Sequence, residues 1–279
     1  MIVQGMKGLG DNIYQRAFVK SLRKPIWLET PWPEFYADIP GVNLLRSDTQ
    51  LRTQAKNVAR QPAGVWNRSP RGTMIRIQYG TNGIIPGMTQ CFRVKPQEFD
   101  LPDFAPSPVA GKYVVVRPVT VRSEWRADTR NPLPQYVAQA AAEMRRRGYQ
   151  VVSVADLEDT KEWLVGDPPV ADITYHKGEL PVKQLLALVQ GAAAVIGGIG
   201  WIVPACIAAK VPAWVICGGQ GGYNSPENIT DPCMDLSRIH FAVPDRFCRC
   251  TLKIHNCNKR IACHDQMFAD WADRLPALV

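Results

Sequence analysis

A glycine-rich stretch, GMKGLGDN at residues 5–12, ends with an acidic residue directly before a run with helical spacing. Three roles fit that residue, Asp11. Aspartate is a favoured N-cap of a helix, the backbone amides of the loop can bind an anion, and a carboxylate at the mouth of a cleft can act as a general base. The stretch has neither the GK[ST] ending of a P-loop nor the spacing of a GxGxxG motif. It does not by itself choose among the three roles.

Arginines recur in RPVTVRSEWRADTRNP, residues 117–132, which follows an apolar run at 113–118. A guanidinium offers paired donors that match a phosphate group. Ligands of open α/β sheets bind at the carboxyl ends of strands, so this loop predicts a phosphate site that includes Arg117, Arg122 and Arg130. The alternative is a set of unrelated surface arginines.

Two glycine-rich turns follow apolar runs in the stretch 195–227. The first contains Gly198, Ile199, Gly200 and Trp201, and the second contains Gly218 and Gly219. Small residues at a turn before a helix let a ligand approach the backbone and expose free amides to a diphosphate. Two such turns at neighbouring strand ends predict a diphosphate site better than they predict packing alone.

A cysteine cluster lies at residues 247–265, FCRCTLKIHNCNKRIACHD. Its density of thiols and imidazoles predicts a structural zinc site. The preferred ligands are four thiolates, Cys248, Cys250, Cys257 and Cys263, and either His255 or His264 can replace one of them. The Cys-x-Cys spacing is tighter than in a standard zinc finger, and free buried thiols or disulfides are the alternatives. Four basic residues inside the cluster can track a phosphate backbone or be ordinary solvated charges.

The elements that must position these residues alternate between strand and helix. Strands are predicted at 2–4, 26–29, 42–46, 74–79, 113–118, 151–155, 194–197 and 213–217, and helices at 12–22, 48–60, 181–192 and 201–209, with one more helix starting at Asn131 as N-cap and Pro132. This alternation predicts α/β architecture with parallel, doubly wound sheets. A proline-rich linker at 96–110 divides the chain into an N-terminal domain, 1–105, and a C-terminal domain, 106–279, that face a central cleft.

Composition indicates a globular protein with an anionic partner. The net charge is +8, and residues 1–105 hold 14 lysines and arginines against 8 acidic residues. Residues 184–209 contain no charge and are long enough to span a bilayer. The glycines and the proline within them favour a buried strand–turn–helix unit instead, and no secretory signal is apparent. We therefore expect a cytoplasmic protein without a membrane span and with reduced cysteines.

In the order of its motifs the chain resembles glycosyltransferase family 9, the heptosyltransferase-like enzymes of the GT-B fold. GLGDNIYQRAFVKSL resembles the N-terminal Gly-Asp motif, KYVVVRPVT the start of the donor domain, and AAAVIGGIGWIVPACIAAKVPAWVICGG the nucleotide-binding turn and helix. The turn differs from the family's Asp-Ser-Gly-Pro-x-His, because it has no Asp and no His. The variant is similar to a branch from bacteriophages.

The resemblance implies a role for each site. Asp11 would be the base that takes a proton from the acceptor hydroxyl, in an acceptor-side loop with Lys7, Gly8, Gly10 and Asn12. Arg130 would contact the donor diphosphate, and the 198–201 turn would supply amides near the phosphates. No catalytic metal is expected.

The predicted function is therefore an inverting glycosyltransferase that uses a nucleotide-sugar donor. The predicted acceptor is DNA with hydroxymethylated bases, flipped out of the duplex to reach the cleft. The basic acceptor domain, the bacteriophage-like turn and the predicted zinc site favour it. The basic domain equally suits the alternative acceptor, a phosphorylated glycolipid or saccharide, which is the class that the resemblance implies. The rival prediction is a non-catalytic protein that binds nucleotides or nucleic acid on the same scaffold.

Overall fold

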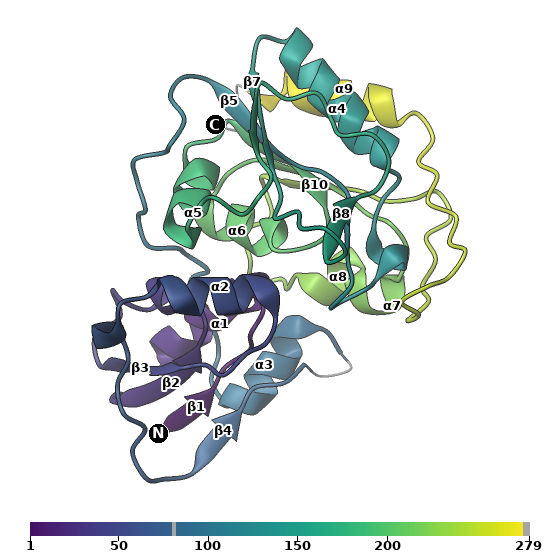
Figure 1. The fold of residues 1–279 in the computed structure, drawn as a ribbon. Helices are drawn as coiled ribbons and strands as arrows, with labels where there is room; N and C mark the ends of the chain where they lie inside the picture. Colours follow the sequence, from purple (N-terminus) through teal and green to yellow (C-terminus); the bar gives the residue numbers. More distant parts are fainter. Residues whose placement is uncertain (80–81, 276–279) are drawn as a thin grey trace. The chain divides into compact units, whose positions relative to one another are not determined.

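The computed structural model describes residues 1–79 and 82–275. Contacts between Cα atoms divide the chain into two compact units (Figure 1). The first unit is Met1–Asp103 with Ile229–Met234, and the second is Phe104–Asn228 with Asp235–Val279. The break near residue 103 falls inside the proline-rich segment, but the return of 229–234 to the first unit has no signal in the sequence. Each unit is described by itself.

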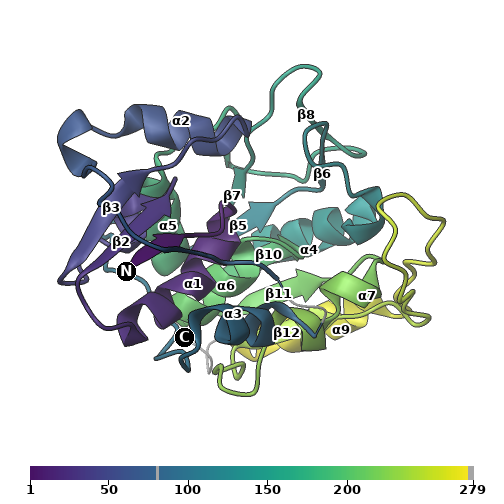
Figure 2. The same cartoon turned by 90° about the horizontal axis from the view of Figure 1, so that it is seen from below.

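The first unit is built on a four-stranded sheet in the order β3-β2-β1-β4. All its pairs are parallel. The strands are β1 Ile2–Gln4, β2 Ile26–Thr30, β3 Val42–Arg46 and β4 Met74–Arg76, and the helices are α1 Leu9–Ser21, α2 Arg52–Arg60 and α3 Ile84–Phe92, with 3-10 turns at Pro33–Phe35 and Ala63–Val65. Helix α2 covers one face of the sheet, and α1 and α3 cover the other (Figure 2).

The core of this unit lies between α1, α3 and the sheet. Phe18 of α1 stacks on Phe92 of α3 with ring centroids 5.2 Å apart, and both rings are buried. Segment 229–234 is tied to α1 because the Tyr14 hydroxyl donates a 2.6 Å hydrogen bond to the Ile229 carbonyl. Helix α1 is therefore fixed from two sides, which holds the loop at its N-terminus in place.

The second unit is built on a six-stranded sheet in the order β12-β11-β10-β5-β7-β9. All its pairs are parallel. Its strands are β5 Tyr113–Arg117, β7 Gln150–Val154, β9 Ile173–Tyr175, β10 Ala194–Gly198, β11 Ala213–Ile216 and β12 Ile239–Ala242. A separate antiparallel ribbon joins β6 Thr120–Arg122 to β8 Glu162–Leu164.

Helices cover both faces of this sheet, as expected for parallel strands whose central members β5, β10 and β11 are largely apolar. Helix α4 (Pro134–Arg146) and helix α9 (His264–Asp273) lie side by side on one face, and α5 (Val182–Gln190) and α6 (Ile202–Ala209) lie on the other (Figure 1). Two short helices, α7 Gly221–Asn224 and α8 Pro226–Ile229, and a 3-10 turn at Asp128–Arg130 complete the unit. Buried Trp214 of β11 packs edge-on against Phe268 of α9 at 5.3 Å.

The fold class of parallel α/β sheets is confirmed, while several predicted boundaries are wrong. Helix α4 begins at Pro134 with Leu133 as its N-cap. Asn131 is not a cap, because its side-chain amide donates to the Thr120 carbonyl at 2.8 Å. The apolar run 184–209 is divided among α5, β10 and α6. Among the described residues, every helix is too short or too polar to cross a bilayer.

Candidate active site

The glycine-rich loop enters α1 one turn earlier than the sequence predicts. Gly8 is the N-cap, so Asp11 is the third helical residue and is not the cap. The carboxylate folds back over Gly8, where an added Cβ would collide with its Oδ2. The Tyr79 hydroxyl donates a hydrogen bond to Asp11 Oδ1. Asp11 is only partly buried and sits in the first turn, where the helix dipole stabilises its negative charge.

Side chains of α1 hold the loop from behind. The Asn12 side-chain amide donates to the carbonyls of Met6 (2.7 Å) and Gly8 (2.8 Å), and its Oδ1 accepts from Thr30 Oγ1 at 2.7 Å. Gln15 Oε1 accepts from the Met6 amide at 2.9 Å. Asn12 is fully buried, so its side chain serves the shape of the loop. Gly10 is within α1.

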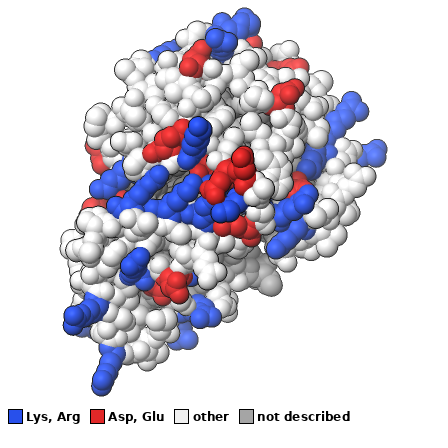
Figure 3. Space-filling model, in the orientation of Figure 1, with Lys and Arg blue, Asp and Glu red and all other residues white. Residues whose placement is uncertain are grey.

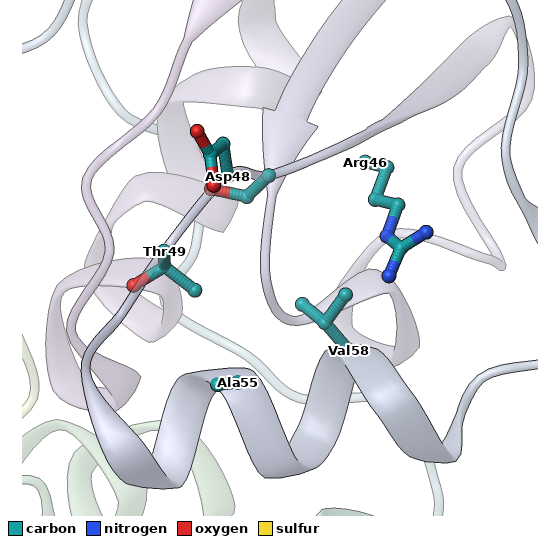
Figure 4. A pocket seen from close by; sticks show the side chains of 6 residues that line it. Arg46, Asp48, Thr49, Ala55 and Val58 are labelled. Carbon is teal, nitrogen blue, oxygen red and sulfur yellow. The ribbon is translucent and has the colours of Figure 1, made fainter.

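Lys7 links this loop to the segment after β3. Its ammonium donates to the Asp48 carbonyl, and its own carbonyl accepts from Trp32 Nε1 at 2.9 Å. A pocket of about 260 Å³ opens between this segment and α2. Figure 4 shows Arg46, Asp48 and Thr49 on its strand side, with Ala55 and Val58 on its helix side. The pocket lies at the carboxyl end of β3, the edge at which parallel sheets bind ligands.

In the second unit, arginines gather around a buried glutamate at the carboxyl end of β5. Glu162 of β8 is 3% exposed, and its carboxylate accepts from Arg122 Nε at 2.6 Å and from Thr120 Oγ1 at 2.9 Å. Burial lowers the pKa of Arg117 to about 10, Glu162 acts to raise it, and the charges of Arg122 and Arg130 lower it further. Arg117 therefore stays protonated at neutral pH beside two like charges. This is an electrostatic environment that an anion would stabilise.

The turn from β10 into α6 lies beside these arginines. Gly198 closes β10 against Pro132, and a Cβ there would collide with the proline ring. Ile199 is buried. Gly200 is more open, since a Cβ there would meet only Arg117 Nη1 at 3.8 Å. Trp201 is the N-cap of α6. Of the first three residues of α6, Pro204 has no N–H and the Val203 amide donates to the Gly200 carbonyl at 3.2 Å. The Ile202 amide is therefore the backbone donor of this turn that a phosphate beside the Arg117 guanidinium can use.

The second predicted glycine turn, 218–222, is occupied by the protein's own backbone. The Gly219 amide donates to the Thr129 carbonyl at 2.6 Å. A Cβ at Gly218 would collide with the carbonyls of Arg130 and Asn131, and one at Gly219 with Cys257 Sγ. These glycines permit close packing of three loops. The sequence predicts a free amide here for a diphosphate, but the Gly219 amide is already bonded to the protein's own backbone.

The cysteine cluster gathers three of its predicted ligands. Cys248, Cys250 and Cys257 meet His255, with all ligand atoms within 4.8 Å of one another. Cys263 lies outside this group, at the N-cap of α9, where it lines a separate pocket of about 490 Å³. His255, one of the two alternatives, takes the fourth position. His264 is buried in the core instead and accepts a 3.2 Å hydrogen bond from Trp214 Nε1.

The spacing of the cluster fits a tetrahedral metal. His255 Nδ1 lies 3.3 Å from Cys257 Sγ and 3.6 Å from Cys248 Sγ, and Cys250 Sγ lies 3.6 Å from Cys257 Sγ. Zn–S bonds of 2.3 Å imply ligand separations of about 3.4–3.8 Å. All eight cysteines lie in described residues and are free thiols. Figure 3 shows basic side chains on the side where Figure 1 draws this C-terminal segment in yellow.

Sequence reasoning missed three residues of these sites: Tyr79, Glu162 and Thr129. Tyr79 is distant from Asp11 in the chain, and Glu162 comes from a three-residue strand. Thr129 is buried between Gly219 and Lys253. The residues next to them in the sequence do not reveal these contacts, because the partners are 40 or more residues away in the chain. No local signal singles out Glu162, because it follows other charged residues in DLEDTKE, residues 156–162.

No protein-family model matches the chain, and no curated protein matches it in sequence. Solved structures do match its fold. The dodecameric iron-containing heptosyltransferase TibC of enterotoxigenic E. coli, in complex with ADP-D-β-D-heptose, aligns with 13% identity and a TM-score of 0.64 over 100% of this chain and 76% of that one.

Two further matches cover nearly all of both chains. The family 9 glycosyltransferase of Veillonella parvula aligns with 14% identity and a TM-score of 0.62, over 100% of this chain and 97% of that one. E. coli ADP-heptose LPS heptosyltransferase II aligns with 12% identity and a TM-score of 0.59, over 99% and 98%. The bacteriophage branch stays a prediction. The chain therefore has the GT-B-like fold of the family 9 heptosyltransferases.

Proposed function

We propose that this protein is a glycosyltransferase that moves a sugar from a nucleotide-sugar donor to an acceptor hydroxyl. The observation that carries the proposal is the arginine cluster around Glu162, next to the start of α6. Arg117, Arg122 and Arg130, together with the Ile202 amide, offer positive charge and paired donors to a diphosphate leaving group. TibC, which shares the fold, has been solved with a nucleotide sugar of this kind.

The proposed catalytic base is Asp11. As the acceptor oxygen attacks the anomeric carbon, the bond from that carbon to the nucleoside diphosphate breaks and the acceptor proton passes to the Asp11 carboxylate. One base and one direct displacement give an inverting reaction. The hydrogen bond from Tyr79 orients the carboxylate. The remaining loop residues, Lys7, Gly8, Gly10 and Asn12, shape this site and leave the proton transfer to Asp11.

For the acceptor we propose a phosphorylated saccharide or glycolipid. The pocket beside Arg46 in the first unit is small and combines this cation with the Asp48 carboxylate and the hydroxyls of Ser47 and Thr49. The carboxylate and hydroxyls suit sugar hydroxyls, and Arg46 suits a phosphate. One similar structure is named as a lipopolysaccharide heptosyltransferase. The hydroxymethylated DNA base stays a prediction that rests on the charge of residues 1–105, the bacteriophage-like turn and the predicted zinc site.

We also propose that Cys248, Cys250, Cys257 and His255 hold a structural metal ion. Three thiolates and one imidazole suit zinc or iron, and the fold relative TibC is an iron-containing protein. A metal bound there would cross-link the segment 247–262, which contains no helix or strand. Elemental analysis of protein purified without added chelator tests this, with about one zinc or iron per chain expected.

Donor binding is tested first by thermal unfolding with nucleoside diphosphates and nucleotide sugars. A ligand at 100 times its dissociation constant adds about 2.7 kcal/mol, which raises the melting temperature by roughly 5–10 °C for a chain of this size. The variant Arg117→Gln should lose the shift, and Arg145→Gln, which pairs with Asp172 on the surface, should keep it. No shift with any nucleotide would contradict the donor assignment.

The base is tested separately. Asp11→Asn should bind the donor with unchanged affinity and transfer sugar about 10²–10⁴-fold more slowly, the range for loss of a general base. Asp103→Asn, an exposed change in the same unit, is the control. Normal transfer by Asp11→Asn would exclude the role. Nucleotide-stimulated DNA binding without any turnover would favour the non-catalytic alternative.

A further inference from the structure

Three loops of the second unit meet at one buried residue. We call residues 248–257 the cysteine loop, residues 128–131 the arginine loop and residues 218–222 the glycine turn. The residue is Thr129, which is 1% exposed. Its hydroxyl donates to the Leu252 carbonyl at 2.6 Å, its amide donates to the Lys253 carbonyl at 3.2 Å, and its carbonyl accepts from the Gly219 amide at 2.6 Å.

Further hydrogen bonds join the glycine turn to the backbone of the cysteine loop. The amides of Gly221 and Gly222 donate to the carbonyls of Cys248 (2.8 Å) and Cys250 (3.1 Å). Gln220, which adopts a left-handed conformation with φ of 58°, donates through its side chain to the Leu252 carbonyl at 3.1 Å. Two of the acceptors thus belong to metal ligands themselves, so the position of the ligands sets the position of the turn.

The arginine loop is held in the same way. Besides the contacts of Thr129, Lys259 donates through its ammonium to the Asp128 carbonyl at 2.8 Å. The next residue after Thr129 is Arg130, one of the three arginines of the donor site. The position of its guanidinium is defined only if the backbone at 128–131 is fixed. A mobile backbone would let the guanidinium N–H donors occupy many positions.

Apart from these hydrogen bonds, the cysteine loop has little packing to order it. It contains no helix or strand, and its apolar side chains Leu252 and Ile254 are 54% and 65% exposed. A segment that buries so little apolar surface cannot offset the loss of chain entropy on ordering. Metal binding to three thiolates and an imidazole supplies folding free energy for such a segment.

We infer that the metal-bound cysteine loop positions the donor site, and that Thr129 is the positioning residue that connects them. Loss of the metal should release the carbonyls of residues 248–253, and with them the arginine loop and the glycine turn. The affinity for the nucleoside diphosphate part of the donor should then fall, although none of the four proposed metal ligands is among the residues proposed to bind the phosphates. This inference rests on the proposed donor site.

The first test compares metal-loaded and chelator-stripped full-length protein by hydrogen exchange, which requires no nucleotide. The amides of Thr129, Gly219, Gly221 and Gly222 should exchange at least about tenfold faster after stripping. The amides of β5 should not change and serve as the internal control. Equal exchange in the two forms, or a protein that binds neither zinc nor iron, would overturn the inference even if the donor site is correct.

The second test measures the dissociation constant for ADP by calorimetry. Thr129→Val, which keeps the branched shape and loses the hydroxyl, should retain its metal and bind ADP about tenfold more weakly, equivalent to ~1.4 kcal/mol. Thr129→Ser should restore the affinity, and exposed Thr174→Val in β9 should not change it. In stripped protein, Thr129→Val and wild type should bind alike. Full ADP affinity in loaded Thr129→Val would overturn the inference.

The two proposals fail in different ways. If loaded wild-type protein shows metal-dependent protection of these amides but binds no nucleotide, the donor assignment is wrong and the mechanical link between the loops stands. If it binds ADP equally well with and without metal, the donor assignment stands and the link does not control it.

Discussion

Gly219 lies directly against Cys257, so that a Cβ at position 219 would overlap the Cys257 sulfur. Packing this close explains a glycine that the sequence alone associates with phosphate binding. The contact joins a loop after β11 to a proposed metal ligand 38 residues later in the chain. It makes the turn and the proposed metal site sensitive to the same substitution.

Gly219→Ala should therefore destabilise the glycine turn and weaken metal binding by the cysteine loop. Because the backbone of both neighbours is held by hydrogen bonds, the added methyl forces a shift that costs about 1–3 kcal/mol. We expect a lower melting temperature and faster metal loss to a colorimetric chelator. Gly64→Ala is the matched control, since a Cβ there meets nothing within 4 Å. A Gly219→Ala protein that keeps wild-type stability and metal release would show that the loops separate in solution.

The strand–helix alternation predicted the four strands of the first sheet and four of the six strands of the larger sheet, because runs such as 113–116 and 194–198 are apolar and bounded by turn residues. It did not reveal β6, β8, β9 or β12, nor helices α3 and α9. Strands β6, β8 and β9 have three residues each and carry too little periodicity. It also placed the start of α4 at Asn131. That residue is a good cap by type, but its amide is already committed to the Thr120 carbonyl, a tertiary contact that overrides local preference.

The candidate site was predictable in its residue types and less so in its arrangement. Asp11 and the arginines have chemistry that is recognisable from the sequence. Their partners Tyr79 and Glu162 come from distant segments, and hydrogen bonds across such separations leave no local pattern. The same holds for the cysteine cluster, in which the fold selects His255 over Cys263 as the fourth member.

Glu162→Gln should destabilise the second unit and loosen the arginine cluster. The carboxylate is buried and bonded to Arg122 and Thr120. Neutralising it leaves Arg117 next to like charges without the group that opposes them. Loss of a hydrogen bond to a charged group, with Arg122 itself one-third exposed, should lower the free energy of unfolding by about 1.5–3 kcal/mol. Urea titration measures this.

The control for that change is Glu158→Gln, because Glu158 pairs with Lys161 at the surface and exposed ion pairs contribute about 0–1 kcal/mol. A Glu162→Gln protein as stable as this control would mean that the buried carboxylate does not balance the arginines.

Stability should fall as the pH drops below neutral because of His264. Burial lowers its pKa, although Asp265 acts in the opposite direction. The unprotonated Nε2 accepts from Trp214 at 3.2 Å, and Tyr136 and Phe268 pack against the ring. A histidine whose pKa is lower in the folded state contributes its full stability above its unfolded pKa, near 6.5. That contribution declines as the pH falls from there toward the folded pKa, by up to about 1.4 kcal/mol per pH unit.

Melting temperatures between pH 7.5 and pH 5 check this prediction. His264→Gln, which can still accept the Trp214 hydrogen bond but does not titrate, should show a shallower decline than wild type. His240 is partly buried, and its pKa is lowered by burial and by Arg274, so part of the slope should remain. Parallel curves for the variant and wild type would assign the whole slope to other groups.

Arg16→Met should destabilise the first unit from the middle of α1. The guanidinium is 3% exposed and donates to the Phe35 carbonyl at 2.6 Å, to both oxygens of Asp38 at 2.7 Å and to Asp100 at 3.1 Å. Removing it leaves a buried carbonyl and two carboxylates without a shared donor. Because both carboxylates retain access to solvent, we expect a loss of about 2–3 kcal/mol by urea unfolding.

Substitution by lysine and a change in pH separate geometry from charge. Arg16→Lys keeps the charge but cannot form the paired bonds to Asp38, so it should recover less than half of the loss. Burial disfavours the charged form of Asp100, but the hydrogen bonds from Lys20 and Arg16 outweigh this and lower its pKa. The stability from this carboxylate is therefore complete above its unfolded pKa, near 3.8, and is lost as the pH falls below it. Exposed Arg23→Met is the control. If Arg16→Met and wild type lost stability equally below pH 4, the pairing with Asp100 would not be the source of that acid sensitivity.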